Sequence, residues 1–500
     1  MADRKLEFMN KADALKLIVY PKSVDEAAGT VCAIVRDKGK KLLAVLGNGE
    51  FSGEEKGGLQ LCTLTAENVQ ALMGQFPYLK PQSHRGRPFT IGLGDRLGLA
   101  TPGHVRAIAP YDVFPVFAQQ SMRELKLTGR SFAGVIADAA FGVFQEGYKG
   151  GYGADGDHLK TKDEIAYALE SGCSMITLDC SEQIETKAAS LSAEETAAAY
   201  GRLPLELREH YERGYLGKEL PLVGRLSAAE LQRIVLTFWR AIEHAVDCYR
   251  YIREVSRSDA DFELSIDETL TVTTPAEHFV IANELAMNGI RSDSVAPHFT
   301  GTFEKGVEYS GDLHAFARDF EVHQRIAEHF GYKLSLHSGS DKFSVFSTVG
   351  RVTGGRVHVK TAGTNWLEAL VVIAEADPAL FRRAHKFAIE HRSEAEKYYH
   401  VSTDVRDIPD IDLQNDAYLP EYLRLPASRQ TMHIAYGLLL AEDWFREGFF
   451  RVLDEREEAY YRRLEEHIGT HVRSLQTAKA NSANAVANGC PVEIVAGQSR

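Results

Sequence analysis

Short apolar segments alternate with amphipathic helical stretches from about residue 88 to about residue 360. Eight of these segments end in polar or charged residues and are predicted strands: 90–94, 113–117, 151–154, 175–178, 262–266, 294–297, 333–336 and 356–359. The second is the weakest of them because Pro115 lies within it. Eight consecutive β/α units favour closure of the sheet. The pattern therefore predicts an α/β fold, a (β/α)8 barrel of the TIM type over residues 86–380, with an open doubly wound sheet as the alternative.

The segments outside this repeat predict additional helices and a small separate module. Residues 1–85 contain strand-like runs at 15–20 and 41–46 between turn signals, typical of a small N-terminal α/β module. An insertion at about 181–260 is helical, and Ser227 and Glu230 form a capping-box pattern before its longest apolar stripe. Residues 381–478 are predicted to be a helical C-terminal region. Residues 479–500 are rich in Ala, Asn, Ser and Gly, which predicts a poorly ordered tail.

Composition narrows the functional classes. The chain has 57 basic and 70 acidic residues and a net charge of −13, which argues against a nucleic-acid-binding protein. It has neither an apolar run long enough for a membrane helix nor an apolar secretory signal at its start. The six cysteines form no C-x-x-C pair. We therefore expect a cytoplasmic protein that acts on a small molecule, with homo-oligomerisation left open.

Histidines follow three different predicted strands. Catalytic residues of such barrels project from the C-terminal ends of the strands, and His158, His298 and His337 occupy these positions. A single histidine there is more often structural, but three on one ring suit a divalent transition metal. These three are the predicted metal ligands. The third position is the least constrained, and His298 could be replaced by Asp179, His314 or Glu268.

Carboxylates at the same edge suggest proton transfer. Asp157 adjoins a proposed ligand and Glu268 follows another strand, so we predict that they act as acid and base. Other strand-end residues are the predicted substrate-binding residues: Asp95, Arg96, Lys160, Asp179 and Lys342. The side chains of Lys160 and Lys342 could bind a carboxylate group of the substrate. Barrels often bind phosphate after the last two strands, where this sequence has glycines, so a sugar phosphate stays open as the substrate. No dinucleotide or P-loop motif is present.

Several blocks of sequence resemble the tagaturonate epimerase family. They are residues 94–104, 157–160, 303–306 and 336–344, and the likeness extends from about residue 80 to 400. The resemblance implies interconversion of D-tagaturonate and D-fructuronate by inversion at C4, with a divalent metal held by His158, His337 and a third ligand. It also implies acid and base roles for Asp157 and Glu268. The related interconversion of D-tagatose and D-fructose stays open, as does the choice among Zn, Mn, Ni, Co and Fe.

The chemistry of a 2-ketose constrains the mechanism. Its C4 hydrogen is not acidic because only C1 and C3 adjoin the carbonyl group. We therefore expect retro-aldol cleavage of the C3–C4 bond, rotation of the aldehyde and re-addition, with charge stabilised by the metal. Two alternatives are a metal-dependent sugar or sugar-phosphate aldolase, which would release the fragments, and a non-catalytic carbohydrate-binding protein.

Overall fold

The computed structural model describes residues 2–256, 259–269, 271–361, 363–399 and 401–487. At its centre, parallel strands close into a barrel, each pairing with the next along the chain and the last with the first. They are β7 (Phe89–Gly92), β8 (Phe114–Ser121), β9 (Gly153–Leu159), β10 (Met175–Asp179), β11 (Asp261–Ile266), β12 (Ser294–Pro297), β13 (Lys333–Leu336) and β14 (Val357–Lys360). The predicted (β/α)8 barrel is confirmed, and the alternative of an open sheet is wrong.

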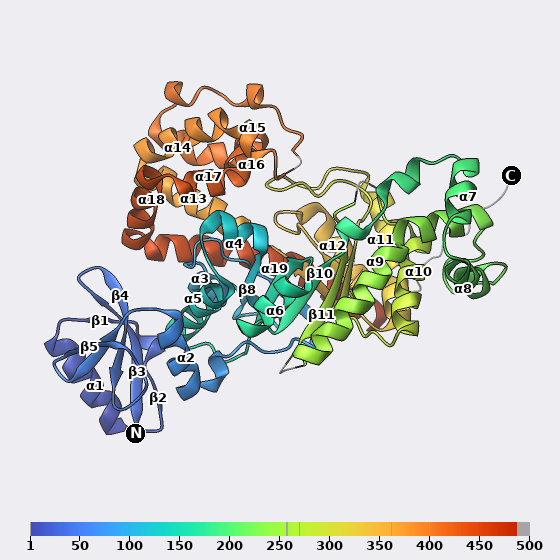
Figure 1. Cartoon of the computed structure of the whole chain (residues 1–500). Helices are drawn as coiled ribbons and strands as arrows, with labels where there is room; N and C mark the ends of the chain where they lie inside the picture. Colours follow the sequence, from blue (N-terminus) through green and yellow to red (C-terminus); the bar gives the residue numbers. More distant parts are fainter. Residues whose placement is uncertain (1, 257–258, 270, 362, 400, 488–500) are drawn as a thin grey trace.

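A ring of helices covers the barrel. In the part of the chain that the structure describes, it consists of α3 (Thr101–Ile108), α5 (Phe132–Gln145), α6 (Lys162–Glu170), α9 (Ala228–Val255), α10 (Pro275–Met287), α11 (Leu313–Phe330), α12 (Phe343–Thr353) and α19 (Glu457–Ala487). Helix α9 contacts α6 and α10, and α19 contacts α12 and α3 (Figure 1). The fourth and eighth helices of the ring are therefore each reached only after an excursion of the chain.

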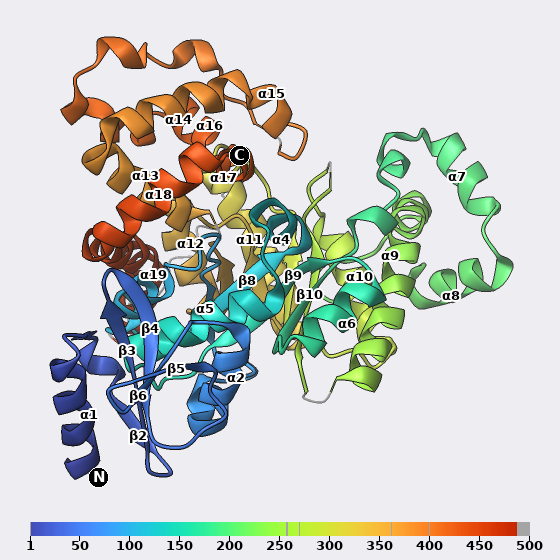
Figure 2. The same cartoon turned by 60° about the vertical axis from the view of Figure 1, so that its left-hand side comes forward.

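The first excursion follows β10. It contains η3 (Ser181–Gln183), η4 (Thr186–Ser190), α7 (Ala193–Gly201) and α8 (Leu205–Tyr215), and Figure 2 shows α7 and α8 projecting away from the barrel. The predicted capping box is present at the start of α9, where the Ser227 side chain accepts from the Glu230 N–H and Glu230 accepts in return. The cap fixes where this long helix begins and returns to the barrel.

The second excursion follows β14 and forms a helical lobe. It contains α13 (Thr364–Ala376), α14 (Pro378–Glu390), α15 (Arg392–Ala395), η5 (Val405–Asp407), η6 (Ile411–Leu413), η7 (Asp416–Arg424), α16 (Pro426–Ile434), α17 (Tyr436–Ala441) and α18 (Asp443–Glu455). Its own hydrophobic core includes the fully buried Trp366, which packs on Phe449 with ring centroids 5.2 Å apart. The Trp366 indole N–H donates to the Met432 carbonyl at 2.8 Å, so the ring is both buried and hydrogen-bonded.

Helix α19 leaves this lobe and returns to the barrel. A glycine lets it approach α3 closely, because a Cβ atom at Gly103 would lie 2.8 Å from Leu464 Cβ. The helix continues to Ala487 and so enters the segment 479–500 that was predicted to be a poorly ordered tail. The remainder of that segment, residues 488–500, lies outside the described residues.

The N-terminal residues form an antiparallel sheet beside the barrel. Its elements are α1 (Ala2–Ala14), β1 (Ile18–Val19), η1 (Pro21–Ser23), β2 (Asp25–Ala27), β3 (Thr30–Asp37), β4 (Lys40–Leu46), β5 (Gly53–Lys56), β6 (Leu59–Cys62), α2 (Ala66–Gln75) and η2 (Pro77–Leu79). Arg36 and Lys41 of this sheet form ion pairs with Glu457, the first residue of α19. The sheet therefore also contacts the last helix of the barrel ring.

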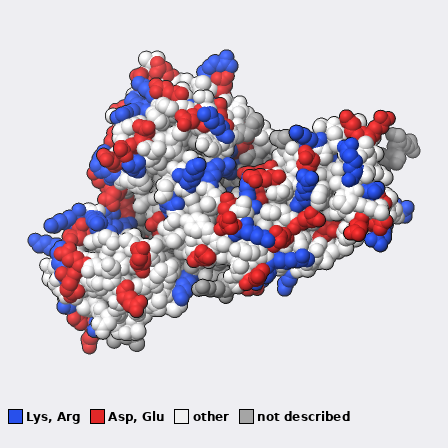
Figure 3. All heavy atoms as spheres, viewed as in Figure 1, with Lys and Arg blue, Asp and Glu red and all other residues white. Residues whose placement is uncertain are grey.

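Charges of both signs lie side by side on the face of the molecule in Figure 3. Among the described residues, no one helix has the length and apolar character needed to cross a membrane. Helices α4 (Met122–Thr128) and α5 together meet that test by length and composition alone, but they are bent by 81° relative to each other.

Candidate active site

The inner wall of the barrel carries charged side chains. Residues two apart on a strand face the same side, and Asp155 and Asp157 of β9 converge with Glu263 of β11 on Lys360 of β14. Lys360 Nζ lies 2.8 Å from Asp155 Oδ2, 2.7 Å from Asp157 Oδ1 and 2.9 Å from Glu263 Oε1. One buried ammonium group therefore joins carboxylates from two other strands.

This arrangement sets the protonation of the carboxylates. Burial raises the pKa of Asp157, but the charge of Lys360 outweighs that effect and places the pKa well below its usual range. For Asp155, burial dominates and raises the pKa to about 6. Asp157 is therefore ionised at neutral pH and can accept a proton.

A bulge at the end of β9 turns two consecutive residues toward the same cavity. His158 has a φ of 52°, in the left-handed region, and the pairing of β9 with β10 is irregular opposite Gly156–Leu159. Side chains of successive residues normally point to opposite faces of a strand. Here, Asp157 and His158 both line the cavity at the C-terminal end of the barrel.

His158 and His337 meet in this cavity, with ring centroids 4.8 Å apart. His337 lies directly after β13, and its Nε2 is 2.8 Å from Glu263 Oε1 while its Nδ1 is 3.2 Å from Asp267 Oδ1. In the group His158, Asp267 and His337, one potential ligand atom from each residue lies within 4.8 Å of the others. A second such group consists of His158, Asp179 and Glu268.

Three buried atoms at this point face carboxylates without a well-formed hydrogen bond among the described residues. His158 Nδ1 lies 3.7 Å from Asp179 Oδ2, and His337 Nδ1 lies 3.2 Å from Asp267 Oδ1. Burial lowers the pKa of His158, but the charge of Asp157 and the nearby Asp179 outweigh it and raise the pKa to about 10. The carboxylates thus favour positive charge here, and imidazole with carboxylate is a donor set that fits a divalent transition metal.

Two other predicted ligands lie elsewhere. His298 follows β12, and its Nδ1 is 3.0 Å from the Thr269 carbonyl oxygen. It belongs to neither of the two groups that the described residues form around His158. His314 is exposed in the first turn of α11, where its N–H donates to the Asp312 side chain. The structure therefore brings together His158, His337, Asp179 and Glu268, but not His298 or His314.

The predicted substrate-binding residues divide into structural and cavity-facing groups. Asp95 accepts backbone N–H groups of the loop after β7, including Leu97 at 2.9 Å and Ala100 at 2.7 Å, and so holds the loop that carries Arg96. Lys342 is fully buried and donates to three carbonyl oxygens. Lys160 lies 3.0 Å from Glu182 and 3.6 Å from Asp179. Arg96 and Lys342 line the cavity.

A cluster of cations forms another part of the cavity wall. It comprises Arg96, Arg123 at the start of α4, and Lys305 in the loop after β12. Arg96 pairs with Glu124 at 2.8 Å, and Lys305 Nζ donates to Ser338 Oγ at 2.8 Å. We call these three residues the cation cluster.

The chain matches known proteins over most of its length. The profile of a family described as tagaturonate epimerase (UxaE) matches residues 20–475. This chain belongs to the tagaturonate epimerase family. It is 37% identical to the tagaturonate/fructuronate epimerase of Thermotoga maritima over 470 residues, which cover 92% of this chain and 97% of that protein.

Solved structures of the family show the same fold. The native and glycerol-complexed crystal structures of the fructuronate-tagaturonate epimerase UxaE from Cohnella laeviribosi match with a TM-score of 0.91 and 46% identity, covering 94% of this chain and 99% of theirs. The chain is therefore an epimerase, an enzyme of the isomerase class. This assignment favours epimerisation over the aldolase and non-catalytic binding alternatives.

Several residues of this family member's site were missed by sequence reasoning. The strand residues Asp155, Thr177 and Glu263 gave a signal, because polar side chains at alternate positions of an apolar strand point into a barrel. Asp267 was visible after the fifth strand but was given no role. By contrast, His433 of α16 reaches the cavity from the helical lobe, and nothing in its local sequence indicates this.

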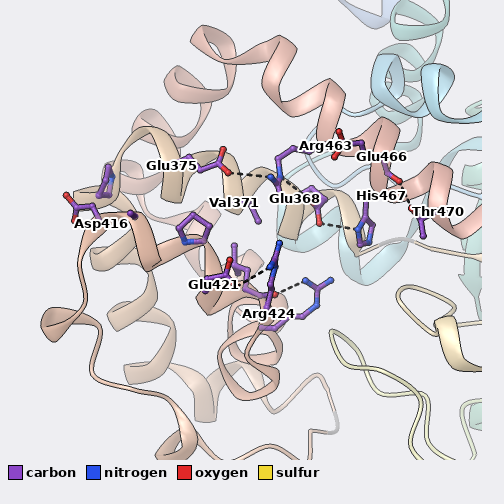
Figure 4. A pocket seen from close by; sticks show the side chains of 15 residues that line it. Glu368, Val371, Glu375, Asp416, Glu421, Arg424, Arg463, Glu466, His467 and Thr470 are labelled. Atoms are coloured by element: carbon purple, nitrogen blue, oxygen red, sulfur yellow. Dashed lines mark hydrogen bonds and ion pairs between the residues drawn. The ribbon is translucent and has the colours of Figure 1, made fainter.

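A larger hollow of the epimerase lies between α13, η7 and α19 (Figure 4). Its charged side chains largely pair with one another: Arg463 donates to Glu368 at 3.0 Å and to Glu375 at 3.4 Å, and Arg424 to Glu421 at 3.3 Å. His467 at its edge lies 3.5 Å from Glu368. Its arginines all have carboxylate partners, including Arg429, which pairs with Asp341, whereas Arg123 and Lys305 of the cation cluster have no such partner among the described residues.

Proposed function

We propose that the protein interconverts D-tagaturonate and D-fructuronate by inverting C4, with a divalent metal as cofactor. The observation that carries the metal is the cluster of buried imidazole and carboxylate atoms around His158, where His158 Nδ1, His337 Nδ1 and Asp179 Oδ2 make no well-formed hydrogen bond among the described residues. His158 and His337 would hold the ion, and Asp267 is our choice of third ligand because it lies in one group with both histidines. When bound, a divalent cation would stabilise negative charge on the ketose oxygens.

The chain's own residues then manage the protons. Asp157, kept ionised by Lys360, accepts the proton of the C4 hydroxyl group as the C3–C4 bond breaks. The resulting aldehyde rotates within the cavity, and the bond re-forms on its other face. Glu268, which lines the same cavity from the loop after β11 and starts the reaction protonated, gives its proton to the new O4 oxyanion. In the reverse direction the two carboxylates exchange roles.

Polar residues of other strands contact His337 and Asp157 and hold their side chains in place. Glu263 accepts from His337 Nε2 and leaves Nδ1 facing the cavity, an arrangement that fixes the ring and its tautomer. Gln119 Nε2 lies 3.5 Å from Asp157 Oδ2. His337 and Asp157 are therefore each in contact with a polar residue of another strand.

A labelled substrate tests the function and the mechanism together. D-tagaturonate carrying deuterium at C4, incubated with metal-loaded protein in ordinary water, should give D-fructuronate that retains the label. Asp157→Asn and Glu268→Gln should retain metal and lower kcat by at least about 100-fold. Loss of the label to solvent would disprove the retro-aldol route, and stoichiometric release of three-carbon aldehyde would indicate an aldolase. No conversion by the metal-loaded protein would refute the proposed function.

A further inference from the structure

We propose that the cation cluster, together with His433, binds the C6 carboxylate of the substrate and thereby determines the preference for sugar acids over neutral ketohexoses. This inference rests on the proposed function and assigns a role to residues that the reaction steps above do not use. It locates the substrate's charged end at Arg96, Arg123 and Lys305, while C4 lies beside Asp157 and Glu268.

The first argument is the excess of positive charge in the cluster. Arg96 has Glu124 as its direct partner at 2.8 Å. Neither Arg123 nor Lys305 has a carboxylate within ion-pair distance among the described residues, and the charges of Glu124 and Glu268 act on both from farther away. Burial and then the charge of Arg123 lower the pKa of Lys305, as expected for cations brought together away from water. An anionic ligand would relieve this repulsion.

The second argument is a set of unsatisfied donors and acceptors. Arg96 is 2% exposed and His433 is 1% exposed, and both line the cavity. In the described chain, Arg96 Nη1 and both ring nitrogens of His433 have no hydrogen-bond partner. Leaving such buried atoms unpaired is costly, so a ligand with acceptor oxygens is expected beside them. A carboxylate can accept hydrogen bonds from Arg96 Nη1 and from the protonated ring nitrogen of His433.

The third argument is preorganisation. The Arg96 guanidinium lies over the Tyr436 ring at 3.9 Å, and the Arg123 guanidinium lies over Tyr399 at 4.9 Å. The two tyrosine hydroxyl groups are 3.2 Å apart, so both arginines rest on one linked platform from the helical lobe. Fixed guanidinium groups suit planar recognition of a carboxylate because little side-chain entropy is lost on binding.

The cluster is also joined to the proposed catalytic end of the cavity. Lys305 donates to Ser338, which directly follows the proposed ligand His337. A phosphate group would find few free hydrogen-bond donors here. The Gly339 N–H already donates to the Lys360 carbonyl at 2.9 Å, and Lys342 already donates to three carbonyl oxygens. The geometry thus favours a carboxylate at this position.

The test compares Lys305→Gln and Arg123→Gln with the parent enzyme on D-tagaturonate and D-tagatose. We expect each variant to lower the ratio of kcat/KM values, uronate over neutral sugar, by about 10- to 100-fold, as for loss of a hydrogen bond to a charged group. Titration calorimetry should show the same loss in affinity for D-tagaturonate, with affinity for D-tagatose nearly unchanged. Lys162→Gln, which removes an exposed lysine paired with Asp247 on the outer surface, is the matched control and should leave the ratio unchanged.

The outcomes separate the two proposals. If both variants left the ratio of kcat/KM values for the two sugars unchanged, with or without an equal loss of activity on both, the proposed carboxylate site would be wrong. Tighter binding of D-tagatose 6-phosphate than of D-tagaturonate would overturn it in favour of a phosphate site. If the parent protein bound D-tagaturonate through these residues but converted neither sugar, the carboxylate site would stand and the proposed epimerisation would fail.

Discussion

The His471 ring accepts a hydrogen bond from the backbone N–H of Asp341, with His471 Nε2 2.9 Å from Asp341 N. Burial lowers the pKa of His471 to about 4, so the ring is neutral, and its Nδ1 lies 2.9 Å from the His467 carbonyl oxygen. Asp341 has a φ of 60° and also pairs with Arg429 at 2.6 Å. The last barrel helix therefore holds the loop after β13, which begins with His337.

Removing this acceptor should loosen the loop. We expect His471→Leu to lower the melting temperature and to reduce kcat/KM by about 10-fold, because a buried N–H is left unpaired next to the cavity. The control His329→Leu changes an exposed histidine of α11 and should alter neither. Native kcat/KM in His471→Leu, measured under conditions where the protein stays folded, would show that the contact has no influence on the site.

The metal site can be tested by comparing histidines. His337→Ala and His158→Ala should lose bound metal and activity together while their circular-dichroism spectra stay native. His298→Ala should keep its metal, since His298 lies outside both groups of potential ligands. Metal content measured by mass spectrometry of dialysed protein decides this. Full occupancy in His337→Ala, or loss of metal in His298→Ala alone, would contradict the ligand set.

Replacing a glycine by alanine should have different effects on stability at Gly103, where α3 packs on α19, and at Gly74, which has open space beside it. Gly103→Ala places a Cβ atom 2.8 Å from Leu464 Cβ and should destabilise the protein by about 1–3 kcal/mol. Gly74→Ala meets nothing within 4 Å in helix α2 and should be neutral or stabilise by up to about 1 kcal/mol. Urea unfolding of both variants measures the difference, and equal effects would argue against tight packing of α19.

A buried histidine predicts a loss of stability in acid. Burial lowers the pKa of His385 to about 4, and its Nε2 lies 2.8 Å from Ser428 Oγ. Because the unfolded chain binds this proton below about pH 6.5, the folded state loses up to about 3 kcal/mol as pH falls from 6.5 to 4. His385→Gln should make unfolding less sensitive to pH over this window. An unchanged slope would show that His385 titrates normally.

The strands could be predicted from the sequence because most of them are short, buried and apolar. The third was predicted at 151–154 but runs over Gly153–Leu159. Its polar residues suggested a loop, yet Asp155 and Asp157 lie in the strand, where both pair with Lys360 inside the barrel. Pro115 is tolerated in β8, where it pairs with Ile91 of β7. Local pattern cannot reveal a partner that lies 200 residues away.

Only the site residues that lie at or directly after strand ends could be predicted from the sequence. His158, His337, Asp157 and Glu268 follow or end strands, and the structure places all four around one cavity. His298 satisfied the same rule but turns toward Thr269, because strand position does not fix the direction of a side chain. Tyr436 and His433 come from a distant lobe, and their place at the site depends on tertiary packing.

The position of α19 bears on how the enzyme is made in the cell. The ribosome must finish the N-terminal sheet, all barrel strands and the whole helical lobe before it reaches Glu457, where the eighth helix begins. Until then, the faces of α3 and α12 that α19 covers stay open to water and to other nascent chains. Closing the ring last, with contacts between ends of the chain, implies slow maturation after translation. A chain truncated anywhere before this helix would therefore form an incomplete, aggregation-prone barrel rather than a smaller active enzyme.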